Sequence, residues 1–206
     1  MSADLGAAGH HTGQQPVTVV LVRHGPLAPD GRCAGRHHDP PLAPSAGQRL
    51  TDLALRLPRP LGPVVCSPLG RATRTAELLG ALSPTIDDRW AERDFGDLEG
   101  RAWEEVWDIV GPDALADAAS WAAFTPAGGE TFDQVAARVA DALIEVTAVA
   151  TGPPTVVVTH AGPIRLALRH ALGLTPAQAL AFDPAPATAT WLTRWGAHWT
   201  VDRVGA

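Results

Sequence analysis

A buried strand that ends in a histidine is the feature that most constrains the fold of this chain. Residues 17–22 form an unbroken run of β-branched and apolar side chains, and Arg23, His24 and Gly25 follow directly. Such a run predicts a strand that is covered on both faces, as in a parallel sheet. Because open α/β sheets bind ligands at the carboxyl ends of their strands, we expect Arg23 and His24 to face a crevice.

A second stretch has the same form. Residues 155–159 are again β-branched, and His160, Ala161 and Gly162 follow them. Packing alone does not explain two buried strands that each end in a histidine close to a glycine. We therefore expect His24 and His160 to meet at one edge of a sheet.

In the first half of the chain, stretches with apolar residues at helical spacing alternate with short runs typical of strands. Apolar residues at helical spacing predict a helix over residues 45–57, and residues 63–66 predict a short buried strand. Residues 67–80 predict a helix with Ser67 as its N-cap, Pro68 at its first position and Gly80 just beyond its end. Residues 85–91 are typical of a short strand or extended segment.

The second half of the chain contains a segment of irregular pattern, and further predicted helices and strands follow it. Residues 93–129 are predicted to be an inserted helical lid, whose tryptophans either bury a small satellite core or contact the substrate. A capping box at residues 131–134 opens a long amphipathic helix, and another helix ends at Gly173. Residues 188–204 predict a hairpin that turns at Gly196. The order predicts an α/β fold: a three-layer α/β/α sandwich with a mainly parallel central sheet.

Length and charge restrict the class of protein. The 206 residues fit an N-terminal disordered arm over residues 1–15 and one domain over residues 16–206. The net charge of −6 argues against a nucleic-acid partner. No stretch is long and apolar enough to predict a membrane span or a signal peptide, so we expect a cytoplasmic protein, either a monomer or a homodimer.

The basic and sulfur-containing residues exclude several chemistries. All 16 basic side chains are arginines, so neither Schiff-base chemistry nor a lysine-dependent phosphate loop is available. Arginine instead binds phosphate through two parallel hydrogen bonds. Cys33 and Cys66 are too few for a disulfide framework or a zinc site, and both are predicted to be reduced. We expect no metal and no cofactor.

Arginines beside a histidine suit phosphoryl transfer. A phosphate monoester is a dianion, so an attacking nucleophile needs the charge neutralised and the geometry fixed. Arg23 and Arg71 are the predicted phosphate ligands, and their charge should lower the pKa of His24 and free a ring nitrogen for attack. Arg71 lies in the first turn of a predicted helix, where its charge is unfavourable unless an anion is nearby. His160 is expected to donate to a phosphoryl oxygen.

The leaving alkoxide needs a proton from a separate acid. Glu92 is the leading candidate, because it follows a predicted strand end and opens an acidic loop. Asp94, Asp97 and Glu99 lie in the same loop and compete for this role.

Four motifs in order resemble the histidine phosphatase superfamily, also called phosphoglycerate mutase-like. They are Leu21-Val22-Arg23-His24-Gly25, Ser67-Pro68-Leu69-x-Arg71-Ala72-x-x-Thr75-Ala76, Glu92-Arg93-Asp94-Phe95-Gly96 and Val158-Thr159-His160-Ala161-Gly162. The resemblance covers residues 17 to about 192. It implies that His24 becomes phosphorylated, that Arg23, Arg71 and His160 complete the phosphate pocket, and that Glu92 is the proton donor.

Within this superfamily the chain looks most like α-ribazole-5′-phosphate phosphatases. This likeness rests on residues 31–36, 95–100 and 126–130, together with Trp103. The chain departs from the common pattern after Gly25. Many members have an acidic or amide residue followed by threonine there, whereas this chain has Pro26-Leu27-Ala28-Pro29. Arg32 and Arg36, in the loop that follows, are the candidates to replace the missing phosphate contact.

Three functions remain open at this point. The leading hypothesis is a phosphomonoesterase that hydrolyses a small phosphorylated metabolite through phosphohistidine on His24, with α-ribazole 5′-phosphate as the candidate substrate. The alternatives are a phosphoglycerate mutase and a catalytically weak phospho-ligand-binding module. The short interval of 68 residues between Glu92 and His160 favours the hydrolase over the mutase.

Overall fold

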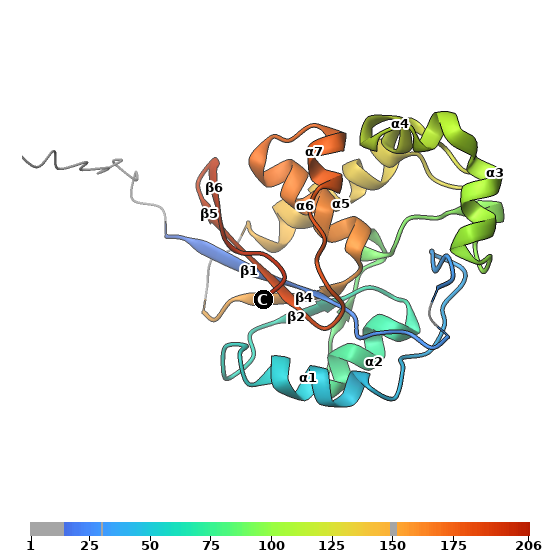
Figure 1. Ribbon diagram of the computed structural model, residues 1–206. Coiled ribbons are helices and arrows are strands. Elements are labelled where there is room, and N and C mark those ends of the chain that lie inside the picture. Colours follow the sequence, from blue (N-terminus) through green and yellow to red (C-terminus); the bar gives the residue numbers. More distant parts are fainter. Residues whose placement is uncertain (1–14, 30, 149–151) are drawn as a thin grey trace, which may run out of the picture.

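One six-stranded sheet forms the centre of the molecule (Figure 1). The computed structural model describes residues 15–29, 31–148 and 152–206, so the arm expected over residues 1–15 lies almost entirely outside the described residues. The strand order is β3-β2-β4-β1-β5-β6. The strands are β1 (Val17–Arg23), β2 (Val64–Cys66), β3 (Thr85–Ile86), β4 (Thr155–Thr159), β5 (Ala189–Trp195) and β6 (His198–Arg203).

Four strands are parallel, and the C-terminal hairpin completes the sheet. β1 pairs in parallel with β4, β4 with β2, and β2 with β3. β5 runs antiparallel to β1 and turns into β6 through Gly196, as the sequence predicts. Because β1 and β4 are parallel neighbours, their carboxyl ends lie side by side, with Arg23 opposite Thr159. The two strands that end in histidines therefore meet at one edge.

Helices cover both faces of the sheet, which confirms the three-layer architecture. α1 (Ala46–Ala54) and α2 (Gly70–Leu78) lie on one face, and α5 (Phe132–Val146) and α6 (Ala161–Leu172) lie on the other (Figure 1). Successive residues of β1 alternate between these layers, because side chains point to opposite faces of a strand. Val19 and Leu21 pack with α5 and α6, whereas Val20 and Val22 pack with α1 and α2.

Several predicted helix ends are confirmed. Thr131 and Gln134 form the capping box at the start of α5, and α6 ends at Gly173 in the left-handed conformation. A short helix, α7 (Pro176–Leu180), begins behind Thr175. Within the described ranges, no helix is long and apolar enough to cross a membrane.

The start of α2 differs from the prediction. The helix begins at Gly70, and its N-cap position is Leu69 rather than Ser67. The Asp39 carboxylate accepts hydrogen bonds from the backbone N–H groups of Gly70 at 2.5 Å and Arg71 at 3.4 Å. A carboxylate at these otherwise unpaired N–H groups replaces a local cap.

The extended segment expected over residues 85–91 is also shorter than predicted. Only Thr85 and Ile86 form a strand, and a 3-10 turn, η1 (Asp88–Trp90), follows them. The Asp87 side chain accepts from the backbone N–H of Arg89 at 2.9 Å, which stabilises this turn. The turn buries Trp90 completely in the core beneath α5.

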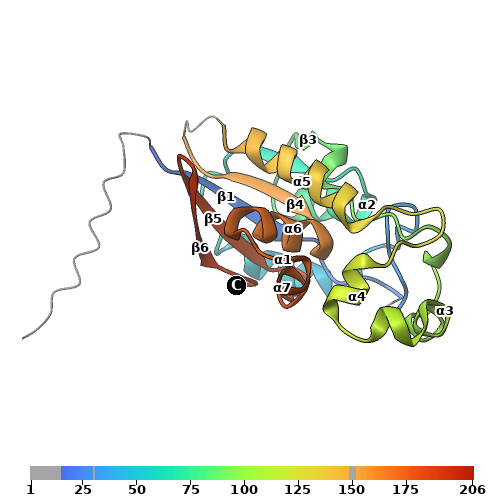
Figure 2. The ribbon, with the colours of Figure 1, turned by 90° about the horizontal axis from the view of Figure 1, so that it is seen from above.

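Residues 93–129 form a segment whose two ends, at residues 94–97 and 127–130, lie side by side. We call these paired ends the neck. The segment contains the 3-10 turn η2 (Gly96–Leu98), α3 (Trp103–Leu115) and α4 (Ala118–Ala123), which lie at one end of the molecule (Figure 2). At the neck, Asp97 N–H donates to the Ala127 carbonyl at 3.0 Å, and Glu130 N–H donates to the Asp94 carbonyl at 2.9 Å. A Cβ atom on Gly96 would lie 2.0 Å from the Ala127 carbonyl oxygen, so only glycine allows this approach.

Candidate active site

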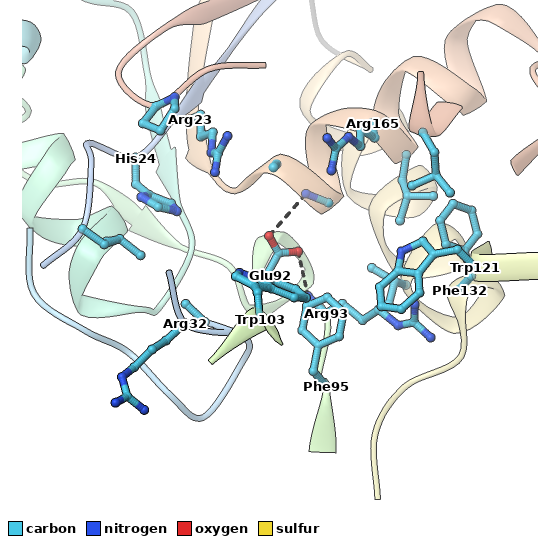
Figure 3. Close-up of a pocket in the computed structure, with 18 of the residues that line it drawn as sticks. Arg23, His24, Arg32, Glu92, Arg93, Phe95, Trp103, Trp121, Phe132 and Arg165 are labelled. Carbon is cyan, nitrogen blue, oxygen red and sulfur yellow. Dashed lines mark hydrogen bonds between the residues drawn. The ribbon is translucent and has the colours of Figure 1, made fainter. Parts of the chain in front are cut away.

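A cavity of about 360 Å³ opens where the carboxyl ends of β1 and β4 face α3 and α4 (Figure 3). The residues that line it come from both halves of the chain. They include Arg23, His24, Arg32, Glu92, Arg93, Phe95, Trp103, Trp107, Trp121, Phe132, Gly162 and Arg165. Of the seven residues singled out by the sequence, Arg23, His24, Arg32 and Glu92 line the cavity, whereas Arg36, Arg71 and His160 do not.

His24 stands directly at the end of β1 and is held by backbone groups. Its own N–H donates to the Thr159 carbonyl at 3.0 Å, which extends the pairing of β1 with β4. Its ring Nδ1 lies 2.7 Å from the Gly25 carbonyl oxygen. A carbonyl only accepts, so Nδ1 carries the proton and Nε2 keeps its lone pair. The Gly25 carbonyl therefore fixes the tautomer of His24.

The protonated form of His24 is strongly disfavoured. Burial lowers its pKa to about 3, with a further contribution from the charge of Arg71 and a smaller one from Arg23, while the bond to Gly25 acts in the opposite direction. Only 5% of the residue is exposed. The direction agrees with the expectation from the sequence, although burial contributes more than the arginines. His24 is therefore a neutral imidazole with a free ring nitrogen at ordinary pH.

His160 lies behind His24 and is completely buried. The two ring centroids are 5.1 Å apart. Arg71 Nε donates to His160 Nδ1 at 3.2 Å, so the His160 proton is on Nε2, which donates to Ser67 Oγ at 2.7 Å. Both ring nitrogens are thus partnered within the protein. Burial and then the charge of Arg71 lower the pKa of His160 well below its usual value.

Arg71 is also enclosed, and its expected anion is a residue of the chain itself. Its NH1 donates to Asp39 Oδ1 at 2.9 Å and to the His38 carbonyl at 3.3 Å, and its NH2 donates to the Gly35 carbonyl at 2.7 Å. The sequence indicated that an arginine in the first turn of α2 requires a nearby anion. The Asp39 carboxylate meets that requirement.

Glu92 is the acidic residue of its loop that reaches the cavity. Its Oε1 accepts from the backbone N–H of Arg93 at 2.9 Å, and its Oε2 lies 3.3 Å from the N–H of Gly162 in the first turn of α6. A Cβ atom on Gly162 would come within 2.2 Å of Glu92 Oε1, so any side chain at this position would displace the Glu92 carboxylate from its present place. Figure 3 shows Glu92 across the cavity from His24.

The competing carboxylates have structural partners. Asp94 accepts from Gly96 N–H at 2.8 Å and contacts His37 Nε2 at 3.0 Å. Glu99 accepts from the backbone N–H groups of residues 36, 37 and 38 and from Phe95, and so holds the loop that follows β1. Neither these two residues nor Asp97 lines the cavity.

Arg138 of α5 positions the Glu92 loop, although sequence reasoning did not identify it. Its NH1 donates to the carbonyls of Arg89 at 2.8 Å and Ala91 at 2.7 Å, and its NH2 donates to the Glu92 carbonyl at 3.1 Å. It also pairs with Glu130 at 2.8 Å. In the sequence it resembles any polar residue on a helix, so no local signal distinguishes it.

The arginines of the cavity differ from those expected. Arg23 NH1 donates to the Pro184 carbonyl at 2.7 Å, and its buried Nε has no partner among the described residues. Arg165, which the sequence analysis missed, joins it from the second turn of α6. Arg32 lines the cavity while donating to the Gly100 carbonyl at 2.7 Å. Arg36 is held outside the cavity by its ion pairs with the carboxylates of Asp88 and Glu130, so the structure does not support it as a phosphate ligand.

The described residues contain no group of three or more histidine, cysteine, aspartate and glutamate side chains arranged to hold a metal ion. The two cysteines are free and buried, and burial raises the pKa of each thiol to about 12. Thiolate chemistry is thereby disfavoured at both positions.

Fold and site together define an α/β protein that presents a neutral histidine beside arginines at the carboxyl edge of a mainly parallel sheet. The chain belongs to the histidine phosphatase superfamily, whose branch 1 it matches over residues 19–206. The family expected from the four motifs is thereby confirmed.

Relatives of known sequence share part of the chain. A Mycobacterium tuberculosis protein described as bifunctional is 34% identical over 164 residues, which are 76% of this chain and 44% of that protein. The chain thus spans less than half the length of that relative. A metal-independent phosphoserine phosphatase of Arabidopsis thaliana is 31% identical over 71% of this chain and 65% of its own length.

Solved structures share almost the whole fold. A mycobacterial glucosyl-3-phosphoglycerate phosphatase, solved with VO3, has a TM-score of 0.81 and 28% identity, and the match covers 92% of this chain and 99% of that one. The α-ribazole phosphatase of Shigella flexneri has the same TM-score, 0.81, with 22% identity and coverage of 92% and 96%. At that identity the second likeness concerns the fold.

Proposed function

We propose that this chain is a phosphomonoesterase that hydrolyses a small phosphorylated metabolite through a phosphohistidine on His24. The observation that carries the proposal is the state of His24: its Nδ1 proton is bound to the Gly25 carbonyl, its pKa is lowered to about 3, and it lines the cavity. A neutral imidazole with a free Nε2 is the form that attacks phosphorus. The names of the related phosphatases support the same chemistry.

The first half-reaction forms the phosphoenzyme. His24 Nε2 attacks phosphorus, the bond from phosphorus to the ester oxygen breaks, and protonated Glu92 gives its proton to the leaving oxygen. Arg23, with an unpartnered Nε, is placed to bind the phosphoryl oxygens, and Arg165 adds positive charge on the same side of the cavity.

The second half-reaction restores the protein. Glu92, now a carboxylate, takes a proton from a water molecule whose oxygen attacks phosphorus. The bond between phosphorus and His24 Nε2 breaks, inorganic phosphate leaves, and Glu92 is again protonated. Neither half-reaction requires His160 or Arg71 to touch the substrate; they hold each other and keep His24 neutral through the charge of Arg71.

α-Ribazole 5′-phosphate is the proposed physiological substrate. The sequence motifs at residues 31–36, 95–100 and 126–130 support it. Free, buried Cys33 and Cys66 fit the reducing cytoplasm, where we propose that the protein acts.

The test is phosphate release from α-ribazole 5′-phosphate, 3-phosphoglycerate, phosphoserine and p-nitrophenyl phosphate by the wild type and by His24→Ala. We expect the wild type to release phosphate and the variant to release none above background. Equal rates for the two proteins would contradict the proposed phosphatase activity and favour a phospho-ligand-binding module. Interconversion of 2- and 3-phosphoglycerate with little phosphate release would instead establish a mutase.

The acid role of Glu92 has its own test. Glu92→Gln keeps the shape of the side chain but removes its proton. Alkyl esters, whose alkoxide needs that proton, should slow by about 100-fold or more, whereas p-nitrophenyl phosphate should slow far less. Equal slowing of both substrate classes would remove Glu92 from the acid role.

A further inference from the structure

The cavity has two chemically different halves. The half at the sheet edge holds Arg23, His24 and Glu92. The opposite half is formed by aromatic side chains of residues 93–129 and by Phe132 of α5. Figure 3 shows Trp121 and Phe132 on the side remote from His24. The mechanism uses only the first half, so the second half has a role that phosphoryl transfer does not explain.

Four of these aromatic residues form a continuous wall, which we define as Phe95, Trp103, Trp107 and Trp121. The Phe95 and Trp103 rings meet edge to face at 6.4 Å, and Trp103 and Trp107 stack at 4.8 Å with 22° between their planes. Trp107 and Trp121 meet at 5.5 Å and 68°. These contacts fix the orientation of each ring, because aromatic pairs of this kind have defined geometries.

Only part of the aromatic wall packs against other buried side chains. Phe95 and Trp103 pack on a small buried cluster of Cys33, Leu98 and Val106, so they serve a satellite core as well as the cavity. Trp107, in contrast, is 40% exposed. Trp103 stacks on one face of this indole, and the part of the ring that stays exposed beside the cavity is available to a ligand.

Arg93 stabilises the aromatic wall through its contact with the Phe95 ring. Its guanidinium lies 5.5 Å from the centre of the Phe95 ring and donates to the carbonyls of Glu130 at 2.9 Å and Phe124 at 2.6 Å. Arg165, the cation on the Arg23 side of the cavity that borders this half, donates to the Phe182 carbonyl at 2.6 Å and pairs with Asp183 at 3.1 Å. Both guanidinium groups already have protein partners, so this half is better suited to a ring than to a second anionic group.

We propose that the aromatic wall binds a planar aromatic group on the alcohol part of the substrate by stacking against Trp107. The preferred substrates are then phosphomonoesters whose alcohol carries an aromatic ring, held while the phosphate is at His24. This inference rests on the proposed function and adds the substrate class.

The experiment uses alkyl phosphates in which the ring is remote from phosphorus, so that the leaving groups are matched. The series has two-, three- and four-carbon spacers ending in a phenyl ring, the same spacers ending in a cyclohexyl ring, and propyl phosphate. The kcat/KM of each ester is measured on the wild type, on Trp107→Leu and on Trp199→Leu. Trp199 lies on β6 outside the cavity and serves as the matched control.

For the best spacer we expect the wild type to prefer phenyl over cyclohexyl by about fivefold, since stacking adds to simple burial. Trp107→Leu should lower this ratio to about one. Trp199→Leu should keep the wild-type ratio. Circular dichroism on each variant checks the fold.

Two results would overturn the inference: a phenyl-to-cyclohexyl ratio near one in the wild type, or a wild-type ratio retained in Trp107→Leu. Failure of the proposed function is distinguishable, because no ester would then be hydrolysed faster than by His24→Ala.

Discussion

The two strands that end in histidines look alike in sequence but hold their histidines differently. His24 has one ring nitrogen on a backbone carbonyl and the other directed to no protein group among the described residues. His160 has both ring nitrogens bound, to Arg71 and Ser67, and it is completely buried. The same local pattern thus gives one histidine with a free ring nitrogen and one whose two ring nitrogens are both bound within the protein.

The difference arises from residues distant in the sequence. Ser67 follows β2, the strand beside β4, and Arg71 is in the helix that starts three residues later. Both belong to the unit on the β4 side of the sheet, so their side chains reach His160 rather than His24. The position at the end of a strand brings a histidine to the edge of the sheet. Side chains from the neighbouring strand and helix then determine whether its ring nitrogens are bound or free.

The largest effect should come from His24→Ala. We expect a loss of about 10⁴-fold or more in kcat, because the nucleophile is removed. Brief mixing with phosphorus-labelled substrate, followed by denaturation under basic conditions that preserve phosphohistidine, should find label on the wild type and none on the variant. His170→Ala, on the exposed side of α6, is the control. Label on the His24→Ala protein would show that another residue is the nucleophile.

His160→Ala should have a smaller effect, a loss of about 100-fold in kcat. The change removes a partner of Arg71 but leaves His24 and its bond to Gly25 in place. The labelling experiment distinguishes the two histidines, since His160→Ala should still become labelled on His24. A failure to label, in protein whose circular dichroism matches the wild type, would give His160 a direct role.

Ser67→Ala should be milder and act through His160 alone. It leaves the Nε2 proton of His160 buried without its acceptor, which we expect to lower the free energy of unfolding by about 2 kcal/mol. Urea unfolding measures this change. The labelling of His24 should be unchanged. Stability equal to the wild type would mean that the Ser67 hydroxyl does not stabilise His160.

The smallest effect, taken per pH unit, is the pH dependence of stability. The folded pKa of His24 lies below its unfolded value of 6.5, so the unfolded state binds a proton that the folded state does not. Stability is therefore unaffected above pH 6.5 and falls as the pH is lowered from 6.5 towards 3, by about 1.4 kcal/mol per pH unit for this group. His160, whose pKa is also lowered, adds a loss of the same sign.

His24→Ala removes one of these two contributions. Urea unfolding between pH 6 and pH 4.5 should then give a slope shallower than that of the wild type by about 1.4 kcal/mol per pH unit. His170→Ala again serves as the control. An unchanged slope would contradict the low pKa of His24.

Much of the fold could be predicted from local pattern. The two strands that end in histidines, the capping box of α5 and the glycine that ends α6 depend on neighbouring residues, and each was found where the sequence placed it. The start of α2 could not be predicted, because its cap is Asp39, 31 residues before Gly70. A local pattern favoured Ser67 only because serine is a common cap.

The site was predictable where strand ends determine it. His24, Arg23 and Glu92 line the cavity as expected, since each lies at or near the end of a sheet element. Arg71 was expected to bind the substrate phosphate, and the structure shows it paired with the Asp39 carboxylate of the chain itself. Arg165 and Arg138 were missed, because an arginine on a helix shows its role only after the helix is packed.

The neck between residues 94–97 and 127–130 has a consequence for how the substrate range of this protein could change. Its two backbone hydrogen bonds hold the ends of the segment together, and the acid-bearing loop stays outside it, anchored by Arg138. Residues 104–123, which exclude Glu99 and the residues that bond to the loop after β1, could therefore be exchanged as one segment, by recombination or in the laboratory, without cutting the sheet that carries the nucleophile. In such a chain, the alcohol part of the substrate that is recognised could change while the residues that transfer the phosphoryl group stay the same.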